Sequence, residues 1–419
     1  MWRSTSIKLL TFQLLITISG WTYEKISYPG PILLSPGFEM RGGAQSIASL
    51  HFHLASLEDN LLGTKWGPEN TVTGKMAGLA GRSLKFALLD LPVDYFSMVF
   101  MHEWYGHGAR YRELGLSGID YGYEWPPPYG AGGGWAGYSS SPGEYSTQER
   151  LGIWIGGIES EHVLNRHLRQ RWMVTGSMHY RESWLYFWSL QNILVYIGDA
   201  LDLVENQQRF NDPQAYIHYL NADNGFHTIS SYPYSLDDLK KASNLNALDP
   251  FFWLSIYNNL IGYLWGGQPS AFMPSLELGK AKYLPSVHVG LTPFGMETYL
   301  ENYLLLDEVL YLLYFRWGET SYYDDWGGVG GLVSYPFSTS TFSVDLKLDL
   351  WRQPSLKFGG DEELRGGKTG AAFSLRSYFK IPDTRYPIKA IIEVGYKSVG
   401  FLEGYPLDKA PVLLFGIQM

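Results

Sequence analysis

Cysteine is absent from the 419-residue chain. Neither a disulfide framework nor a thiolate metal site can form, so any bound metal must be held by histidine and carboxylate side chains. Charged residues are also scarce, at 17% of the chain, and the formal net charge is -9. Nucleic-acid binding needs clustered lysine and arginine, so this composition excludes nucleic acid as an expected partner.

Long uninterrupted apolar runs are missing as well. Two apolar and aromatic segments, at about 182–204 and 250–265, contain polar residues such as Gln191 and Asn258. This mixture favours buried helices over membrane-spanning ones.

The first twenty residues have the order of a secretory signal. Basic residues come first, a short apolar stretch follows, and the segment ends on the small residues Ser19 and Gly20. We therefore expect residues 1–20 to be a signal peptide and the protein to be exported, to the periplasm or outer membrane of a Gram-negative-type bacterium.

Aromatic residues are abundant, at 16% of the chain, with 31 Tyr and 15 Trp. Tyr and Trp gather where one end of a side chain is wet and the other is apolar, as at membrane interfaces and in aromatic clefts. A stretch rich in these residues and in glycine and proline, about 114–147, is expected to be a long loop that acts as a lid, a cleft wall or a linker.

The periodicity of apolar residues changes along the chain. Helical spacing predicts helices at about 86–115 and 150–171, whereas alternation with a period of two dominates after about residue 284. We expect an α+β protein with a mainly helical metal-site domain, residues 21–283, followed by an antiparallel β domain of about eight strands, residues 284–419.

The predicted strands carry apolar residues on one face, as Phe342, Val344 and Leu346 illustrate. Alternation of this kind is typical both of an outer-membrane barrel and of a soluble sandwich. The aromatic content and the expected export favour the barrel, so the C-terminal β region is a candidate for membrane contact.

The strongest chemical signal is the segment His102-Glu103-Trp104-Tyr105-Gly106-His107. Two neutral imidazoles and one further ligand can hold a zinc ion with an open position for water, and a neighbouring carboxylate can take the proton of that water. His102 and His107 are thus candidate metal ligands, and Glu103 is the candidate general base.

The spacing of these histidines departs from the usual helical motif. They lie five residues apart, so on a regular helix about 140° would separate them, against about 40° for His-Glu-x-x-His. A one-residue helical bulge would bring the rings together, and Gly106 would permit it at low steric cost.

The segment resembles the His-Glu-x-x-Gly-His motif of the dipeptidyl peptidase III family of zinc metallopeptidases. That family takes its third zinc ligand from a glutamate on a later helix. The resemblance therefore implies that Glu159 or Glu161 completes the site, and Asn165, one turn after Glu161, favours Glu161. The resemblance covers the six residues His102 to His107 and at most one downstream segment, and it implies a similar site without a shared fold.

Two other interpretations remain open. His102, His107, His162, His167 and His179 resemble the histidine boxes of integral-membrane di-iron oxygenases, although adjacent His-His pairs are absent. A non-enzymatic outer-membrane or envelope β protein, with helices that serve packing alone, is the second. The favoured hypothesis is an exported zinc-dependent hydrolase of the metallopeptidase type, acting on a peptide or amide substrate.

Overall fold

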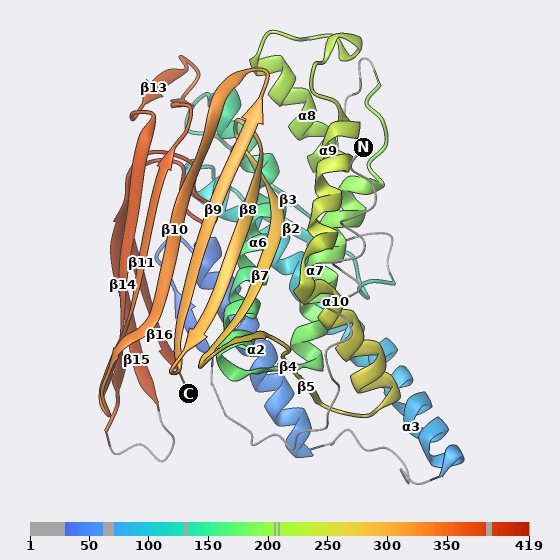
Figure 1. Ribbon diagram of the computed structural model, residues 1–419. Coiled ribbons are helices and arrows are strands. Elements are labelled where there is room, and N and C mark those ends of the chain that lie inside the picture. The colour runs from blue at the N-terminus through green and yellow to red at the C-terminus, as the bar shows by residue number, and fades with distance from the viewer. Residues whose placement is uncertain are drawn as a thin grey trace, which may run out of the picture.

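The computed structural model describes residues 30–61, 71–129, 133–204, 207, 210–382 and 388–418. The expected signal peptide, residues 1–20, lies outside these ranges. Helices fill the first part of the chain and a large antiparallel sheet the second, which confirms the predicted α+β class (Figure 1).

The helices form a layer beside the sheet. They are α2 (Met40–Leu61), α3 (Val72–Lys85), η1 (Phe86–Asp90), α4 (Leu91–Phe100), η2 (Met101–His107), α5 (Gly108–Glu113), α6 (Thr147–Thr175), α7 (Tyr180–Gly198), α8 (Asp212–Asp223), η3 (Ile229–Ser231), α9 (Leu236–Ser243), η4 (Asn244–Leu248), α10 (Pro250–Tyr257) and η5 (Asn258–Trp265). The consecutive elements η1 to α5 confirm the helix predicted at about 86–115, and α6 contains the one predicted at 150–171.

Helix α6 is the longest of these and lies between the other helices and the sheet (Figure 1). A capping box defines its start, because the side chain of Ser146 accepts from the Glu149 amide and Glu149 accepts from the Ser146 amide. It ends at Gly176, whose φ of 64° is the left-handed conformation that glycine adopts at low cost.

The main sheet has ten strands in the order β1-β16-β15-β14-β11-β10-β9-β8-β7-β6, and all neighbours are antiparallel. Their bounds are β1 (Pro31–Leu34), β6 (Leu276–Leu278), β7 (Ala281–Thr292), β8 (Gly295–Leu306), β9 (Val309–Thr320), β10 (Tyr323–Ser338), β11 (Phe342–Arg352), β14 (Thr369–Lys380), β15 (Lys389–Lys397) and β16 (Ala410–Gln418). Within the described residues β1 and β6 are its edges. Strand β1 comes from the start of the chain, so the sheet is not built from the C-terminal region alone.

Three short strand pairs lie outside this sheet. They are β2 (Asp120–Tyr123) with β3 (Gly134–Gly137), β4 (Ser177–His179) with β5 (Ser270–Phe272), and β12 (Leu356–Phe358) with β13 (Glu363–Arg365). The first pair belongs to the aromatic stretch 114–147, which therefore contains a small hairpin.

The hydrophobic core lies between the helices and one face of the sheet. A single cluster of buried side chains includes Leu164 and Leu168 of α6 together with Tyr299 and Tyr303 of β8. The regions 21–283 and 284–419, which differ in periodicity, thus share one core. Among the helices of the described residues, none is both long and apolar enough to cross a bilayer.

Charged side chains also fill the space between the helices and the sheet. Glu301 of β8 pairs with Arg166 and Arg169 of α6. Glu393 of β15 lies between Arg41 of α2 and Arg376 of β14. Removal of charges from water is costly unless they are paired, and these pairs join helices to the inner face of the sheet.

Candidate metal centre

The helix that carries the motif is distorted where the sequence predicts it. Residues Met101–His107 form a π-helical segment, and at its end the Gly108 amide donates to the Glu103 carbonyl, five residues back. The wider turn brings the His102 and His107 rings to the same side, with centroids 5.0 Å apart. The predicted one-residue bulge is confirmed.

Gly106 is needed for close packing rather than for an unusual backbone conformation. A β-carbon at this position would lie 2.7 Å from both the Gly156 carbonyl oxygen and the Gly157 α-carbon of helix α6. A β-carbon on Gly157 would in turn lie 2.2 Å from Nε2 of His102. These glycines let η2 and α6 approach closely enough to share a site.

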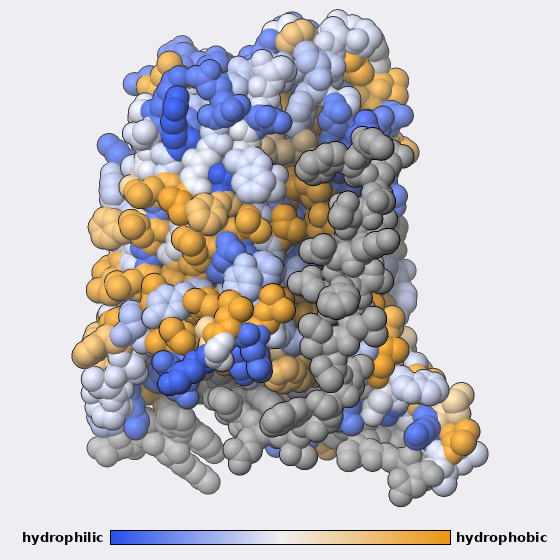
Figure 2. Space-filling model, in the orientation of Figure 1, coloured by the Kyte–Doolittle hydropathy of each residue, from blue (hydrophilic) through white to orange (hydrophobic). Residues whose placement is uncertain are grey.

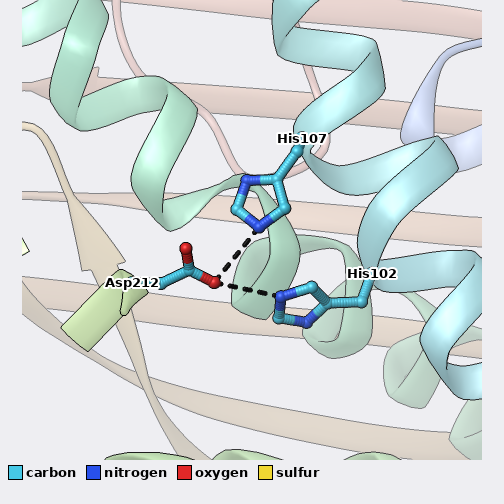
Figure 3. Close-up of side chains that lie close together, drawn as sticks. All are labelled: His102, His107 and Asp212. Atoms are coloured by element: carbon cyan, nitrogen blue, oxygen red, sulfur yellow. Dashed lines mark hydrogen bonds and ion pairs between the residues drawn. The ribbon is translucent and has the colours of Figure 1, made fainter. Parts of the chain in front are cut away.

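Both histidines direct Nε2 at one carboxylate oxygen, Oδ2 of Asp212 (Figure 3). The two nitrogen–oxygen distances are each 3.1 Å. Zinc ligands lie about 2.0–2.1 Å from the metal, so in a tetrahedral site they lie about 3.3 Å from one another. Both nitrogen–oxygen distances are therefore close to the spacing of ligands around a shared cation, and all three atoms lie within 4.8 Å of one another.

The other nitrogen of each ring faces a fixed acceptor. Nδ1 of His102 lies 2.9 Å from Oε1 of Glu161, and Nδ1 of His107 lies 2.8 Å from the Ile153 carbonyl oxygen. An acceptor at Nδ1 holds the proton there in a neutral imidazole and leaves the lone pair on Nε2. The orientation and the tautomer of both rings thus suit metal binding through Nε2.

Asp212 occupies the first position of helix α8. Asn211 caps that helix in a capping box with Gln214, and Pro213 follows in the first turn. The hydroxyl of Tyr196, from α7, lies 3.3 Å from Oδ2 of Asp212. Sequence reasoning missed Asp212, which lies 105 residues from His107; the available signal was an acidic residue in the start pattern Asn-Asp-Pro-x of a helix.

The charged groups of this site strongly shift one another's pKa values. Burial alone would lower the pKa of both histidines, but the contacts of His102 with Asp212 and Glu161, and those of His107 with Asp212, outweigh it and raise both pKa values. Burial raises the pKa of Asp212, yet the two histidines overcome this effect and hold it well below its ordinary value. Without a metal, the Asp212 carboxylate therefore favours protonation of the two imidazoles beside it.

The Glu103 side chain is buried beside the two rings, and its carboxylate makes no hydrogen bond or ion pair within the part of the chain that the structure describes. Its charge contributes to the raised pKa values of His102 and His107, and also of Tyr123. Among the described residues, this carboxylate therefore lies next to two candidate ligands without a side-chain partner of its own.

The β2-β3 hairpin packs against the motif helix. A β-carbon on Gly134 of β3 would lie 3.1 Å from Cγ of Glu103, and the ring of Tyr121 lies 4.5 Å from that of Trp104. The hydroxyl of Tyr123 is buried without a hydrogen-bond partner among the described residues. The hairpin thus encloses the side of the site that holds Glu103.

The two glutamates proposed as the third ligand have different environments. Glu161 contacts Nδ1 of His102 and accepts from Nδ2 of Asn192 at 2.7 Å. Both carboxylate oxygens of Glu159 accept hydrogen bonds from Nη2 of Arg110, and Oε1 also accepts from the Gly404 amide. Asp212 is the carboxylate that meets both Nε2 atoms.

A second buried group consists of His162, His288 and Glu403. Its two rings are stacked with centroids 4.5 Å apart, and Oε2 of Glu403 lies 2.7 Å from Nη2 of Arg166. The guanidinium occupies one side of the only carboxylate in this group, so it is a weaker candidate for a cation than the first.

The histidines of the di-iron interpretation do not gather in one place. His162 belongs to the second group, His167 contacts Gln45, and His179 pairs with Asp59. Within the described residues, only His102 and His107 of that set converge on a common carboxylate.

Comparisons with known proteins add no relative, since no family model, no curated protein and no solved structure matches the chain.

Proposed function

We propose that this protein is a zinc-dependent hydrolase of the metallopeptidase type, exported from the cell, in which His102, His107 and Asp212 bind the metal. The observation that carries the proposal is the convergence of both Nε2 atoms on one Asp212 oxygen while both Nδ1 atoms face acceptors. Metal-binding histidines need this second acceptor to fix their orientation. Glu161 then supports a ligand instead of being one.

The donor set fits zinc. Two imidazoles and one carboxylate leave a fourth position for water, and the absence of cysteine is no obstacle to such a set. Bound zinc lowers the pKa of its water to about 7 and polarises a carbonyl group.

Glu103 supplies the general base in this proposal. It follows ligand His102 directly, is buried near both rings, and has no competing partner among the described residues. Its carboxylate accepts the proton of the attacking water and returns it to the leaving amine. The hairpin with Tyr121, Tyr123 and Gly134 restricts access of bulk water on that side.

The test separates metal binding from catalysis. Glu103→Gln should retain zinc at one ion per chain but lose hydrolysis of a mixed library of quenched peptides by about 10²–10⁴-fold, the usual contribution of a general base. Glu124→Gln, on the exposed part of the same aromatic stretch, is the matched control and should keep both.

Two results would overturn the proposal. An active Glu103→Gln variant would remove the mechanism, and folded wild-type protein without stoichiometric metal after exposure to zinc would remove the enzyme. The second result would favour the non-enzymatic envelope protein instead.

A further inference from the structure

The face of the main sheet that points away from the helices is apolar across most of its width. On the main-sheet strands from β8 to β16 its exposed large side chains are Leu300, Tyr311, Leu313, Phe315, Trp317, Val329, Phe337, Leu346, Leu348, Leu350, Phe373, Leu375, Phe379, Ile392, Val394, Tyr396, Phe415 and Ile417. Figure 2 shows hydrophobic residues gathered over the middle of the sheet. Monomeric soluble proteins rarely expose an apolar patch of this extent.

The two faces of the sheet have the opposite distribution of residues from a sheet with one face in water: charged side chains point inward and apolar ones outward. On β9, Arg316 is 4% exposed, whereas its neighbours Phe315 and Trp317 are 44% and 51% exposed. On β15, Glu393 is 1% exposed between Ile392 at 39% and Val394 at 47%. A sheet in water packs apolar residues inward and turns charged ones outward. This sheet does the opposite on two strands that are separated by three others.

Charge on the outer face is confined to the ends of the strands. Outward positions at one end include Glu319 of β9 and Arg352 of β11. At the other end, the exposed residues Asp307 and Glu308 form the turn between β8 and β9. Between them the outward positions of β9 are Tyr311, Leu313, Phe315 and Trp317. These four positions span about 20 Å at about 3.3 Å per residue.

We infer that this outer face lies against the hydrocarbon of a lipid bilayer, with the strand ends at its two polar surfaces. The charge distribution matches such an occupant, because a charge-free band of about 25 Å between polar borders is what the lipid-facing side of membrane strands presents. Pairing between neighbouring strands satisfies the backbone N–H and C=O groups within the sheet, except along the two edge strands. The inference is independent of the metal site.

Site-directed spin labelling tests this placement, because the chain has no cysteine to compete with an introduced one. Leu313→Cys and Leu348→Cys place a nitroxide on the middle of the outer face, and Glu319→Cys places one at its border. The full chain is reconstituted in vesicles of phosphatidylethanolamine and phosphatidylglycerol. Relaxation by oxygen, which concentrates in hydrocarbon, is compared with relaxation by a water-soluble nickel chelate.

Labels at 313 and 348 should respond several-fold more strongly to oxygen than to the chelate, and the label at 319 should show the reverse preference. Strong relaxation by the chelate at 313 and 348 would overturn the inference. Protection from both reagents with spin–spin coupling between chains would also overturn it, in favour of a second copy of this chain. All three positions are exposed, so labelling should not disturb folding, and circular dichroism of each variant verifies this.

Discussion

At the scale of single residues, the role of a carboxylate in the candidate metal centre depends on which histidine nitrogen it contacts. Asp212 faces Nε2 of both histidines, whereas Glu161 faces Nδ1 of His102 alone. A carboxylate that binds the metal contributes directly to affinity, while one behind a histidine orients the ring and raises its basicity. The two residues should therefore respond differently to the same loss of charge.

We expect Asp212→Asn to abolish stoichiometric zinc binding, and Glu161→Gln to weaken zinc affinity by about 10–100-fold, the usual effect of removing a supporting carboxylate. Competition titration with a chromophoric chelator measures both affinities. Asp202→Asn, an exposed aspartate outside the site, is the control and should bind as wild type does. The reverse order of effects would identify Glu161 as the ligand, as the sequence motif implied.

At the scale of elements, the approach of η2 to α6 creates the site. Gly106 lies against the backbone of Gly156 and Gly157, with no room for a β-carbon. Gly198, at the end of α7, has nothing within 4 Å of such an atom and provides a matched position for the same substitution.

Gly106→Ala should therefore destabilise the fold by about 1–3 kcal/mol, as overpacking of a close-packed contact does, and should also weaken zinc binding because His107 shifts with η2. Gly198→Ala should be neutral or stabilising by up to about 1 kcal/mol, since it restricts the unfolded chain. Urea denaturation in detergent micelles gives both free energies. Equal effects of the two substitutions on the free energy of unfolding would show that the close contact between η2 and α6 at Gly106 does not determine stability.

Sequence reasoning succeeded for elements with a local signal. The helices around the motif, the bulge between His102 and His107, and the alternation of the strands all follow from the spacing of neighbouring residues. Asp212 could not be found in this way, because its place in the site depends on how α8 packs against α6 and η2. The pairing of β1 with β16 was equally inaccessible, since it joins opposite ends of the chain.

At the scale of the whole molecule, the candidate metal centre joins several helices to the sheet. Its residues come from η2, α6, α7 and α8, and α6 itself contacts β7, β8 and β9 of the sheet. Any change in the balance of charge at the site should therefore affect the stability of the helical layer on the sheet.

The pKa shifts define how stability depends on pH without metal. The pKa values of His102 and His107 lie above 6.5, so their stabilising contribution is complete below that pH and is lost as pH rises through the raised values. The pKa of Asp212 lies below 3.8, so its contribution is present above that pH and is lost as pH falls through the lowered value. The metal-free site is thus most stabilising between pH 3.8 and pH 6.5.

Zinc, if it binds as proposed, should reverse this pH dependence, because a metal binds only deprotonated imidazoles and its affinity therefore rises with pH. We expect the difference in Tm between zinc-loaded and chelator-treated protein to widen from about pH 6 to about pH 8, as the ion replaces protons that the metal-free site is losing. Differential scanning calorimetry of the reconstituted chain measures this difference. Asp212→Asn, which lacks the anion that holds both protons and metal, should show a small difference that does not vary with pH. A wild-type difference that narrows over this interval would mean that the imidazoles are not the groups displaced by the metal.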